Sequence, residues 1–321
     1  MTFAVARLSL TTNFCHGTAL KKSLLAPFAA LAFAASGCGA AASYVAADAI
    51  TGGSSRAYAE DDDPELVRQA VPFGLKTMET LLEQHPDHQG LLTSLASGFT
   101  QFGYAFVQAD ADEAEAAGKM AAARAARDRA RRLYLRARDY GLHGLDLRHE
   151  GIASRLTGAR DLDAVVAPLN KDDVPLVYWT AASWALAIAD GKEDMALVAQ
   201  LPAPGALMRR ALVLDEAFDE GAIHEFFISW EPAQGGGEEA FRSAREHFDR
   251  AVELSKGKKL GAYVAYAEAV SVPRQDRAEF NRLLRHVLSA DVEADRPHRL
   301  ANVLAQRRAR LLLSRAEDLF A

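Results

Sequence analysis

Residues Ala130-Arg-Arg-Leu-Tyr-Leu-Arg-Ala137 carry a small side chain, an aromatic ring four positions later and a second small side chain three positions after that. Residues Ala244-Arg-Glu-His-Phe-Asp-Arg-Ala251 repeat this spacing. Positions three and four apart lie on one face of an α-helix. Apolar residues keep this periodicity through most of the chain, and no segment alternates apolar and polar residues between turn signals. The sequence therefore predicts an all-α protein without a β-sheet.

Two further segments keep the phase of this pattern. They are Gly74, Met78, Leu81 and Pro86, and Pro204, Met208, Ala211 and Glu216. Their spacing is similar to the second helix of a tetratricopeptide repeat, where small residues let neighbouring helices approach and a proline ends the helix. The intervals are irregular and the phase fails after Leu142, so we predict a degenerate tetratricopeptide-like array, an α-solenoid. An irregular bundle of alanine-rich helices is the alternative. The segment Thr157–Asp173, with Gly158 and Pro168, predicts a loop.

The N-terminal residues have the pattern of an export signal. Lys21-Lys22 precedes an apolar run, Leu24–Ala35, and small residues lead to Cys38. A cysteine in this position resembles a bacterial lipobox, in which the sulfur receives a diacylglycerol and the new N-terminus is acylated. We predict a lipoprotein signal peptide at residues 1–37 and lipidation at Cys38. The alternatives are a plain signal peptide cut near Ala35 or Ala42, and a transmembrane anchor, which needs roughly 20 apolar residues.

The composition changes after the predicted cleavage point. Residues 39–60 are rich in Ala, Gly and Ser, so we interpret residues 38–62 as the lipidated cysteine and a flexible tether. Asp63, Pro64 and Glu65 predict a helix N-terminus, which places a helical domain at residues 63–321. Without residues 1–37 the chain would carry 34 Lys and Arg against 43 Asp and Glu. This acidic balance argues against nucleic acid and anionic membrane surfaces as partners, and leaves the lipid anchor as the membrane attachment.

No catalytic constellation is visible in the sequence. His85 and His88 are separated by Pro86 and have no further ligand nearby in the sequence. His224 lacks the second histidine of a zinc-protease helix, because Ile228 occupies that position. We therefore expect no enzyme activity, no cofactor and no bound metal. A scaffold of helical repeats usually binds partners.

Aromatic side chains are the best candidates for such binding. Tyr178, Trp179 and Trp184 share one predicted helix, and Phe226, Phe227 and Trp230 share another. Tryptophan and tyrosine are favoured at interfaces because they bury a large area and keep a polar handle. The candidate ligand- or partner-binding residues are Trp179, Trp184, His224, Phe227 and Trp230. The alternative interpretation is that the rings fill the core.

Three segments are similar to one known family. They are Asp219–His224 after the helix Leu207–Phe218, the stretch Phe241–Ser255 before Gly257, and the C-terminal run that begins with Arg299-Leu300-Ala301-Asn302 and continues through Ala305-Gln306, Ala309 and Leu311-Leu312. Together they resemble the TRAP-transporter-associated T component (TatT) lipoproteins over roughly residues 63–321. This resemblance implies a periplasmic, lipid-anchored, all-helical protein with degenerate tetratricopeptide-like repeats.

The resemblance also implies partners. The family is thought to form a homo-oligomer, a trimer around a pore, and to associate with the P component, the solute-binding subunit of a tripartite ATP-independent periplasmic (TRAP) transporter. We therefore expect an accessory subunit that docks the P component and assists the passage of an apolar ligand. The alternative is an envelope adaptor without a ligand of its own. Gly39 after Cys38 gives no inner-membrane retention signal, which slightly favours the outer membrane.

Overall fold

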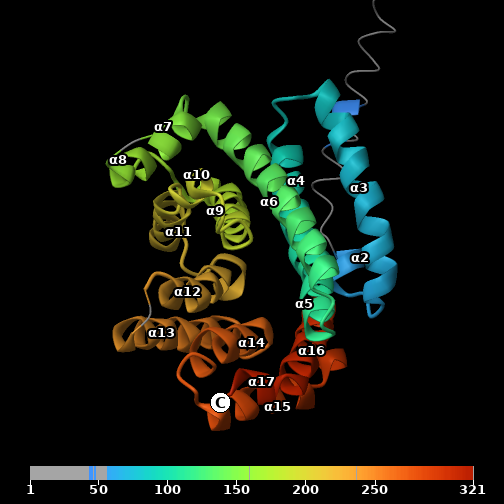
Figure 1. Ribbon diagram of the computed structural model, residues 1–321. Coiled ribbons are helices and arrows are strands. Elements are labelled where there is room, and N and C mark those ends of the chain that lie inside the picture. The colour runs from blue at the N-terminus through green and yellow to red at the C-terminus, as the bar shows by residue number, and fades with distance from the viewer. Residues whose placement is uncertain (1–42, 46, 48–55, 159, 236, 321) are drawn as a thin grey trace, which may run out of the picture. The chain divides into compact units, whose positions relative to one another are not determined.

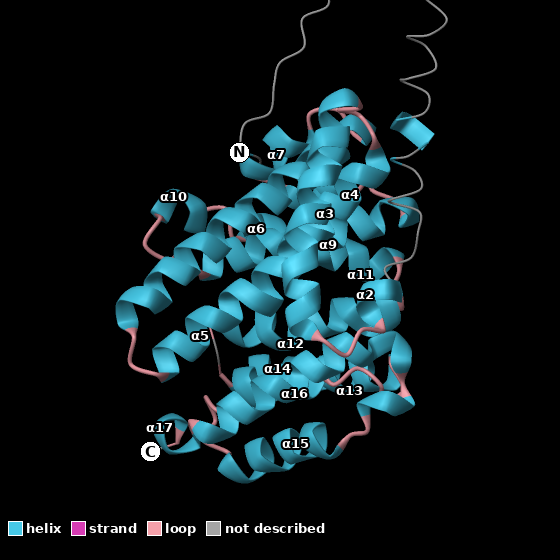
Figure 2. Cartoon of the chain, turned by 90° about the vertical axis from the view of Figure 1, so that its right-hand side faces the viewer, coloured by secondary structure: helices cyan, strands magenta, loops and turns pink. Residues whose placement is uncertain are grey.

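A computed structural model describes residues 43–45, 47, 56–158, 160–235 and 237–320. Every element in these ranges is helical, and Figure 2 shows no strand among the described residues. The predicted all-α class is confirmed. The predicted signal peptide and Cys38 lie outside the described residues. Among the described helices, none combines the length and the apolar character needed to cross a bilayer.

The N-terminal elements form helical hairpins. They are α2 (Arg56–Ala59), α3 (Pro64–Gln84), α4 (Gln89–Phe102), the π-helix η1 (Gly103–Gln108), α5 (Ala109–Ala116) and α6 (Met120–Arg148). The side chain of Asp63 accepts hydrogen bonds from the backbone N–H of Glu65 at 3.0 Å and of Leu66 at 3.1 Å. The predicted helix start is confirmed. Because α4, η1 and α5 follow one another without a break, they form one long helix with a π-helical segment inside it.

The middle elements continue with shorter helices. They are α7 (Ile152–Gly158), α8 (Leu162–Val166), the 3-10 helix η2 (Lys171–Asp173), α9 (Val174–Ala189), α10 (Met195–Val198), α11 (Pro202–Leu214), the 3-10 helix η3 (Phe218–Gly221) and α12 (Ala222–Ala233). The loop prediction for Thr157–Asp173 was wrong in part, because α8 and η2 lie inside it. Asp161 caps α8 by accepting from the N–H of Ala164 at 3.1 Å, and Val165 and Val166 are buried.

The C-terminal elements complete the chain. They are α13 (Glu238–Leu254), α14 (Gly261–Tyr266), the π-helix η4 (Ala267–Ser271), α15 (Arg277–Ser289), the 3-10 helices η5 (Val292–Ala294) and η6 (Arg296–His298), α16 (Arg299–Ser314) and α17 (Ala316–Leu319). Like η1, η4 continues its preceding helix without a break. The described residues therefore contain two π-helical segments, one in each half of the chain.

Helix α6 is central to the first of two apolar cores. Ala130, Tyr134 and Ala137 are fully buried, and α6 packs between α4 and α9 (Figure 1). A Cβ atom added at Gly141 would lie 2.1 Å from Oγ1 of Thr180. Glycine at this position therefore permits the close approach of α6 and α9.

The second apolar core is formed by the C-terminal helices. On α13, Ala244, Phe248 and Ala251 are buried, so both segments with the small–aromatic–small spacing face a core. Helix α12 belongs to both cores: Phe227 packs in the first and Ile228 in the second. This helix is therefore one of the places where the two cores are joined.

The last long helix returns to the first ones. Figure 1 shows α16, in red, beside the end of α5, and α16 also contacts α2 and α3. Arg299 donates to the carbonyl oxygen of Glu60 at 3.3 Å and to the carboxylate of Asp62 at 2.9 Å. Residues 56–62, which we assigned to the tether from the sequence, therefore contact α16. The acidic residues that follow the Ala-, Gly- and Ser-rich stretch supply the partners for arginine.

Candidate functional site

The candidate aromatic residues on α9 lie in two environments. Trp184 is fully buried, its indole N–H donates to Oε1 of Gln200 at 3.1 Å, and the guanidinium of Arg138 lies over its ring. Trp179 is partly exposed and meets the ring of Tyr178 edge-on at 4.9 Å. Trp184 is therefore a core residue, whereas Trp179 reaches solvent.

The candidates on α12 are buried. Phe227 is 1% exposed and stacks on the ring of His247 at 4.8 Å. Trp230 is 8% exposed, stacks on Phe226, and has Gly205 beneath it, where an added Cβ would lie 2.8 Å from the indole. Among the five candidates, Trp179 thus has the most accessible side chain.

His224 forms a polar cluster at the contact between α12 and α13. Its Nδ1 lies 2.8 Å from Nδ1 of His247, and its Nε2 lies 3.2 Å from Glu216, which Arg250 binds through two hydrogen bonds. Burial lowers the pKa of His247 to about 4, with a contribution from His224, and burial also lowers the pKa of His224. Both rings are therefore neutral at pH 7, and one donates to the other. No group of three or more potential metal-ligating side chains occurs in the described part of the chain.

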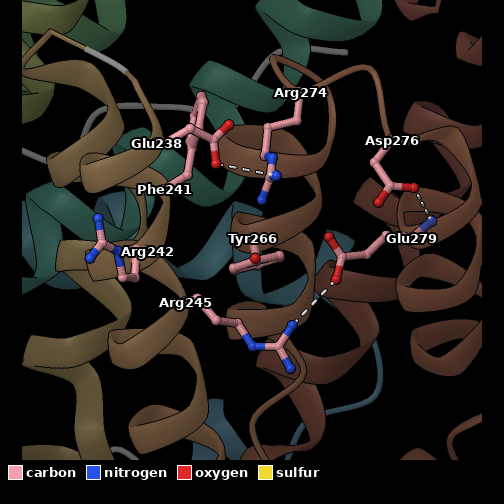
Figure 3. Close-up of a pocket in the computed structure, with 8 residues that line it drawn as sticks. All are labelled: Glu238, Phe241, Arg242, Arg245, Tyr266, Arg274, Asp276 and Glu279. Atoms are coloured by element: carbon pink, nitrogen blue, oxygen red, sulfur yellow. Dashed lines mark hydrogen bonds and ion pairs between the residues drawn. The ribbon is translucent and has the colours of Figure 1, made fainter.

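An open pocket of about 500 Å³ lies between α13, the end of α14 and the start of α15 (Figure 3). It is lined by Glu238, Phe241, Arg242, Arg245, Tyr266, Arg274, Asp276 and Glu279. We call it the outer pocket. Most of its charges are matched internally: Arg245 lies 3.3 Å from Glu279, and Arg274 lies 3.4 Å from Glu238. Figure 3 shows the guanidinium of Arg242 pointing away from Tyr266. A charged ligand that bound these four side chains would have to displace existing ion pairs.

Tyr104 on η1 marks a different kind of surface. Its side chain is 58% exposed, yet burial raises its pKa to about 12, together with the charges of Glu268, Glu225 and Asp112 and against that of Arg308. These four charged groups come from η4, α12, α5 and α16. Tyr104 is thus exposed to water and lies within the electrostatic reach of charged side chains on four other elements.

Tyr178 and Glu225 belong to the same surface. Burial raises the pKa of Tyr178, and the charge of Glu225 adds to that effect. Tyr104 and Tyr178 thus both lie within the electrostatic reach of one carboxylate. We call the residues Tyr104, Tyr178, Glu225, Glu268 and Arg308 the inner surface. It gathers side chains from η1, α9, α12, η4 and α16, which lie far apart in the sequence.

Arg308 connects the inner surface to the N-terminal helices. Its guanidinium donates to Asp112 on α5 at 2.6 Å and to the two oxygens of Glu268 at 2.5 and 3.2 Å. Asp112 also pairs with Arg127 on α6 at 3.4 Å. Carboxylates and guanidinium groups alternate along this network, so its charges are largely compensated.

Sequence reasoning missed the inner surface. Its members belong to no sequence motif. Arg308 lies in an arginine-rich stretch, which is typical of the solvent-exposed face of a helix. One local signal exists at Phe102, Tyr104 and Phe106, because residues two apart cannot share a helical face. With Phe102 and Phe106 both buried, Tyr104 faces elsewhere.

Two comparisons place the chain among known proteins. The family model for the TRAP transporter T-component matches residues 60–320. A protein of Treponema pallidum (strain Nichols), described as uncharacterized, is 30% identical over 277 residues, which are 83% of this chain and 83% of the relative.

Proposed function

The chain belongs to the TRAP transporter T-component family, and from this membership we propose that it docks the solute-binding P component and conducts its solute along the inner surface. Membership in this family gives the chain an accessory role in TRAP transport and an envelope location. An accessory component of a transporter is not an enzyme class. The proposal adds the partner, the route and a lipid anchor at Cys38.

The inner surface is the observation that carries this proposal. A solute route needs a surface that is reachable from water and enclosed by protein. Tyr104 supports such a route, because it is largely exposed and charges on four other elements act on its hydroxyl group. The outer pocket supports a solute route less well, since four of its six charged residues already pair with one another.

Docking is tested with the purified full chain in detergent and the P component of the same TRAP system. We expect a complex, and we propose Trp179 as a contact because it is the accessible member of the predicted set. Trp179→Ala should weaken binding by at least about 2 kcal/mol if the ring is an anchor. Trp184→Ala is the matched control, because loss of this core ring should lower stability instead. Absence of any complex at high micromolar concentrations would contradict the docking proposal.

The lipid anchor is tested by Cys38→Ser. We expect the variant to lose covalent lipid and to leave the membrane fraction. Each buried methylene of an acyl chain contributes about 0.8 kcal/mol to membrane binding, and lasting attachment needs two acyl chains or one chain with a second membrane-binding signal. Mass spectrometry of the mature N-terminus supplies the measurement. An unmodified N-terminus at another residue would contradict lipidation at Cys38. A homo-oligomer, a trimer in our proposal, is tested by the mass of the detergent-solubilised protein.

A further inference from the structure

The first described residues of the chain dock on the helical body. Oγ of Ser43 lies 2.7 Å from Nε2 of His85. The ring of Tyr44 packs 5.4 Å from the ring of His85 and 4.7 Å from that of His88. Ala47 is fully buried. We call Ser43, Tyr44 and Ala47 the docked segment; Figure 1 shows it as the unlabelled blue piece beside the upper end of α3.

The docked segment meets a part of the body that is itself well fixed. His85 ends α3, and its backbone N–H donates to the carbonyl oxygen of Leu81 at 3.1 Å. His88 caps α4: it is 4% exposed, and its Nδ1 accepts from the backbone N–H of Leu91 at 3.2 Å. Because both histidines are held by helix ends, the ring of Tyr44 packs against a rigid surface. The turn between α3 and α4 therefore fixes where the chain enters the body.

Docking shortens the link between Cys38 and the body. Ser43 follows Cys38 by five residues, whereas Arg56, where α2 begins, follows it by 18. Five extended residues reach at most about 18 Å, and 18 residues about 60 Å. Helix α3 has 21 residues and is about 31 Å long. Since the shorter reach is less than the length of α3, a lipid on Cys38 would keep the docked end of this helix near the bilayer.

The same end of the body exposes apolar side chains. Nε2 of His143 on α6 lies 3.2 Å from the carbonyl oxygen of Pro86 in the α3–α4 turn, so this part of α6 adjoins the turn. Leu147, one helical turn further along α6, is 41% exposed, and Tyr44 and Val45 are 48% and 66% exposed. Tyrosine is favoured at membrane interfaces, because its ring is apolar and its hydroxyl group is polar.

The opposite end of the body carries the outer pocket. Figures 1 and 2, seen from directions 90° apart, both show α15 at the end farthest from the α3–α4 turn. The outer pocket lies at the start of α15. With the α3–α4 turn toward the bilayer, this pocket would lie on the far side of the body.

We propose that the α3–α4 turn, together with the docked segment and the adjoining end of α6, faces the head-group region of the bilayer, and that the docked segment sets this orientation. This inference rests on the lipid anchor at Cys38 from the proposed function. Anchoring and orientation are nevertheless read from two different quantities.

The experiment uses the full chain with its own lipid in phosphatidylcholine vesicles that contain head-group spin-labelled lipid, a quencher of short range. Cys15 and Cys38 are the two cysteines of the sequence; the first lies in the proposed signal peptide and the second would carry lipid. An introduced cysteine can therefore carry a fluorophore specifically. The label at Leu147→Cys should lose most of its fluorescence. Arg285→Cys, at an exposed position of α15, is the matched control and should keep it.

Two further variants test the docked segment and leave the helices intact. Inserting about ten glycine and serine residues between Cys38 and Ser43 lengthens the link by up to about 35 Å. Quenching at Leu147→Cys should then fall toward the level of the control. Tyr44→Ala should act in the same direction, because the segment loses its packing on both histidines. Tyr58→Ala on α2, with a ring that is 39% exposed, should leave quenching unchanged.

Each result bears on one claim. Equal quenching at Leu147→Cys and Arg285→Cys, or stronger quenching at the latter, would overturn the orientation. Quenching that the insertion leaves unchanged would overturn the role of the docked segment. A wild-type chain that does not float with the vesicles contradicts the lipid anchor of the proposed function, whereas a floating chain without the quenching difference contradicts only this inference.

Discussion

Two of the places where the two apolar cores meet, at α12 and at α16, differ in chemistry. At the first, α12 packs on α13, with Phe227 in one core and Ile228 in the other. We call this the apolar joint. At the second, α16 meets α3 and α5 through ion pairs: Arg307 binds Glu65 and Glu113, and Arg308 binds Asp112. We call this the ionic joint. Leu300 and Leu304 of α16 also pack against the first core, but both are only partly buried.

The two joints should differ in how much they stabilise the fold and in how easily they open. Fully buried side chains stabilise by about 1.5–3 kcal/mol each, and the effect depends little on salt. Ion pairs with accessible partners contribute about 0–1 kcal/mol each and weaken as salt screens them. The apolar joint should therefore hold the two cores together, while the ionic joint can open at a lower cost. Because Arg308 belongs to both the ionic joint and the inner surface, opening this joint would also change the inner surface.

The largest effect is expected from a substitution that disrupts the apolar joint. Phe227→Ala should lower the free energy of unfolding by about 3–5 kcal/mol, because a fully buried ring is replaced by a cavity. Denaturant unfolding provides the measurement. The matched control is Phe73→Ala, whose ring is 79% exposed and should cost less than about 0.5 kcal/mol. Similar losses for the two variants would mean that α12 does not hold the cores together.

The second prediction concerns pH at the apolar joint. Burial holds the pKa of His247 at about 4, below its ordinary value of 6.5. Between these values the unfolded chain binds a proton that the folded chain does not. Stability should thus be complete above pH 6.5 and fall toward pH 4, by about 1–3 kcal/mol from this group. Thermal unfolding of the wild type should show a steeper decline over this range than His247→Gln. Equal slopes would exclude His247 as the source.

The third prediction tests the ionic joint. Arg308→Met keeps the length of the side chain and removes its charge, which leaves Asp112 and Glu268 without their shared partner. We expect a loss of about 1–2 kcal/mol in the free energy of unfolding. Arg310→Met on the exposed face of the same helix is the control and should be nearly neutral. If both variants behaved alike, the network around Arg308 would contribute no stability.

The smallest effect distinguishes the two joints directly. Raising the salt concentration from 0.05 to 0.5 M should speed amide hydrogen exchange in α16. The corresponding decrease in the free energy of local opening should be less than about 1 kcal/mol. Exchange in α12 should change less, because most of the buried side chains of this helix are apolar. Hydrogen exchange followed by mass spectrometry resolves the two helices. A uniform response of α12 and α16 would contradict the distinction between the joints.

Local patterns in the sequence were sufficient for much of the fold. The all-α class, the helix start at Asp63 and the burial of Ala137 and Ala251 follow from periodicity and capping, which depend on residues within a few turns. The same patterns could not place Trp184 in the core and Trp179 at an accessible position, because that depends on which helices pack against α9.

The inner surface and the ionic joint depend on contacts between distant parts of the chain. Arg308 lies in a charged run that is typical of a solvated helix, and its partner Asp112 comes from a helix nearly 200 residues earlier. Nothing near either residue reveals the pairing. Short helices such as α8 were missed for a different reason: they depend on one capping aspartate and two buried valines, too few residues to form a periodic pattern.

Tyr104 of the inner surface lies in a π-helical segment, and this affects how the residue at its position can change between related chains. A π-helical turn amounts to an α-helix that has accepted one inserted residue. Losing one residue within Gly103–Gln108 would restore ordinary α-helical winding, so the helical turns on either side would keep their faces while the side chains inside the segment shift by one position. The helix would remain continuous, but another residue would take the place of Tyr104. Related chains can therefore exchange the groups at this place of the inner surface through single-residue insertions and deletions, with no substitution needed at the exchanged position.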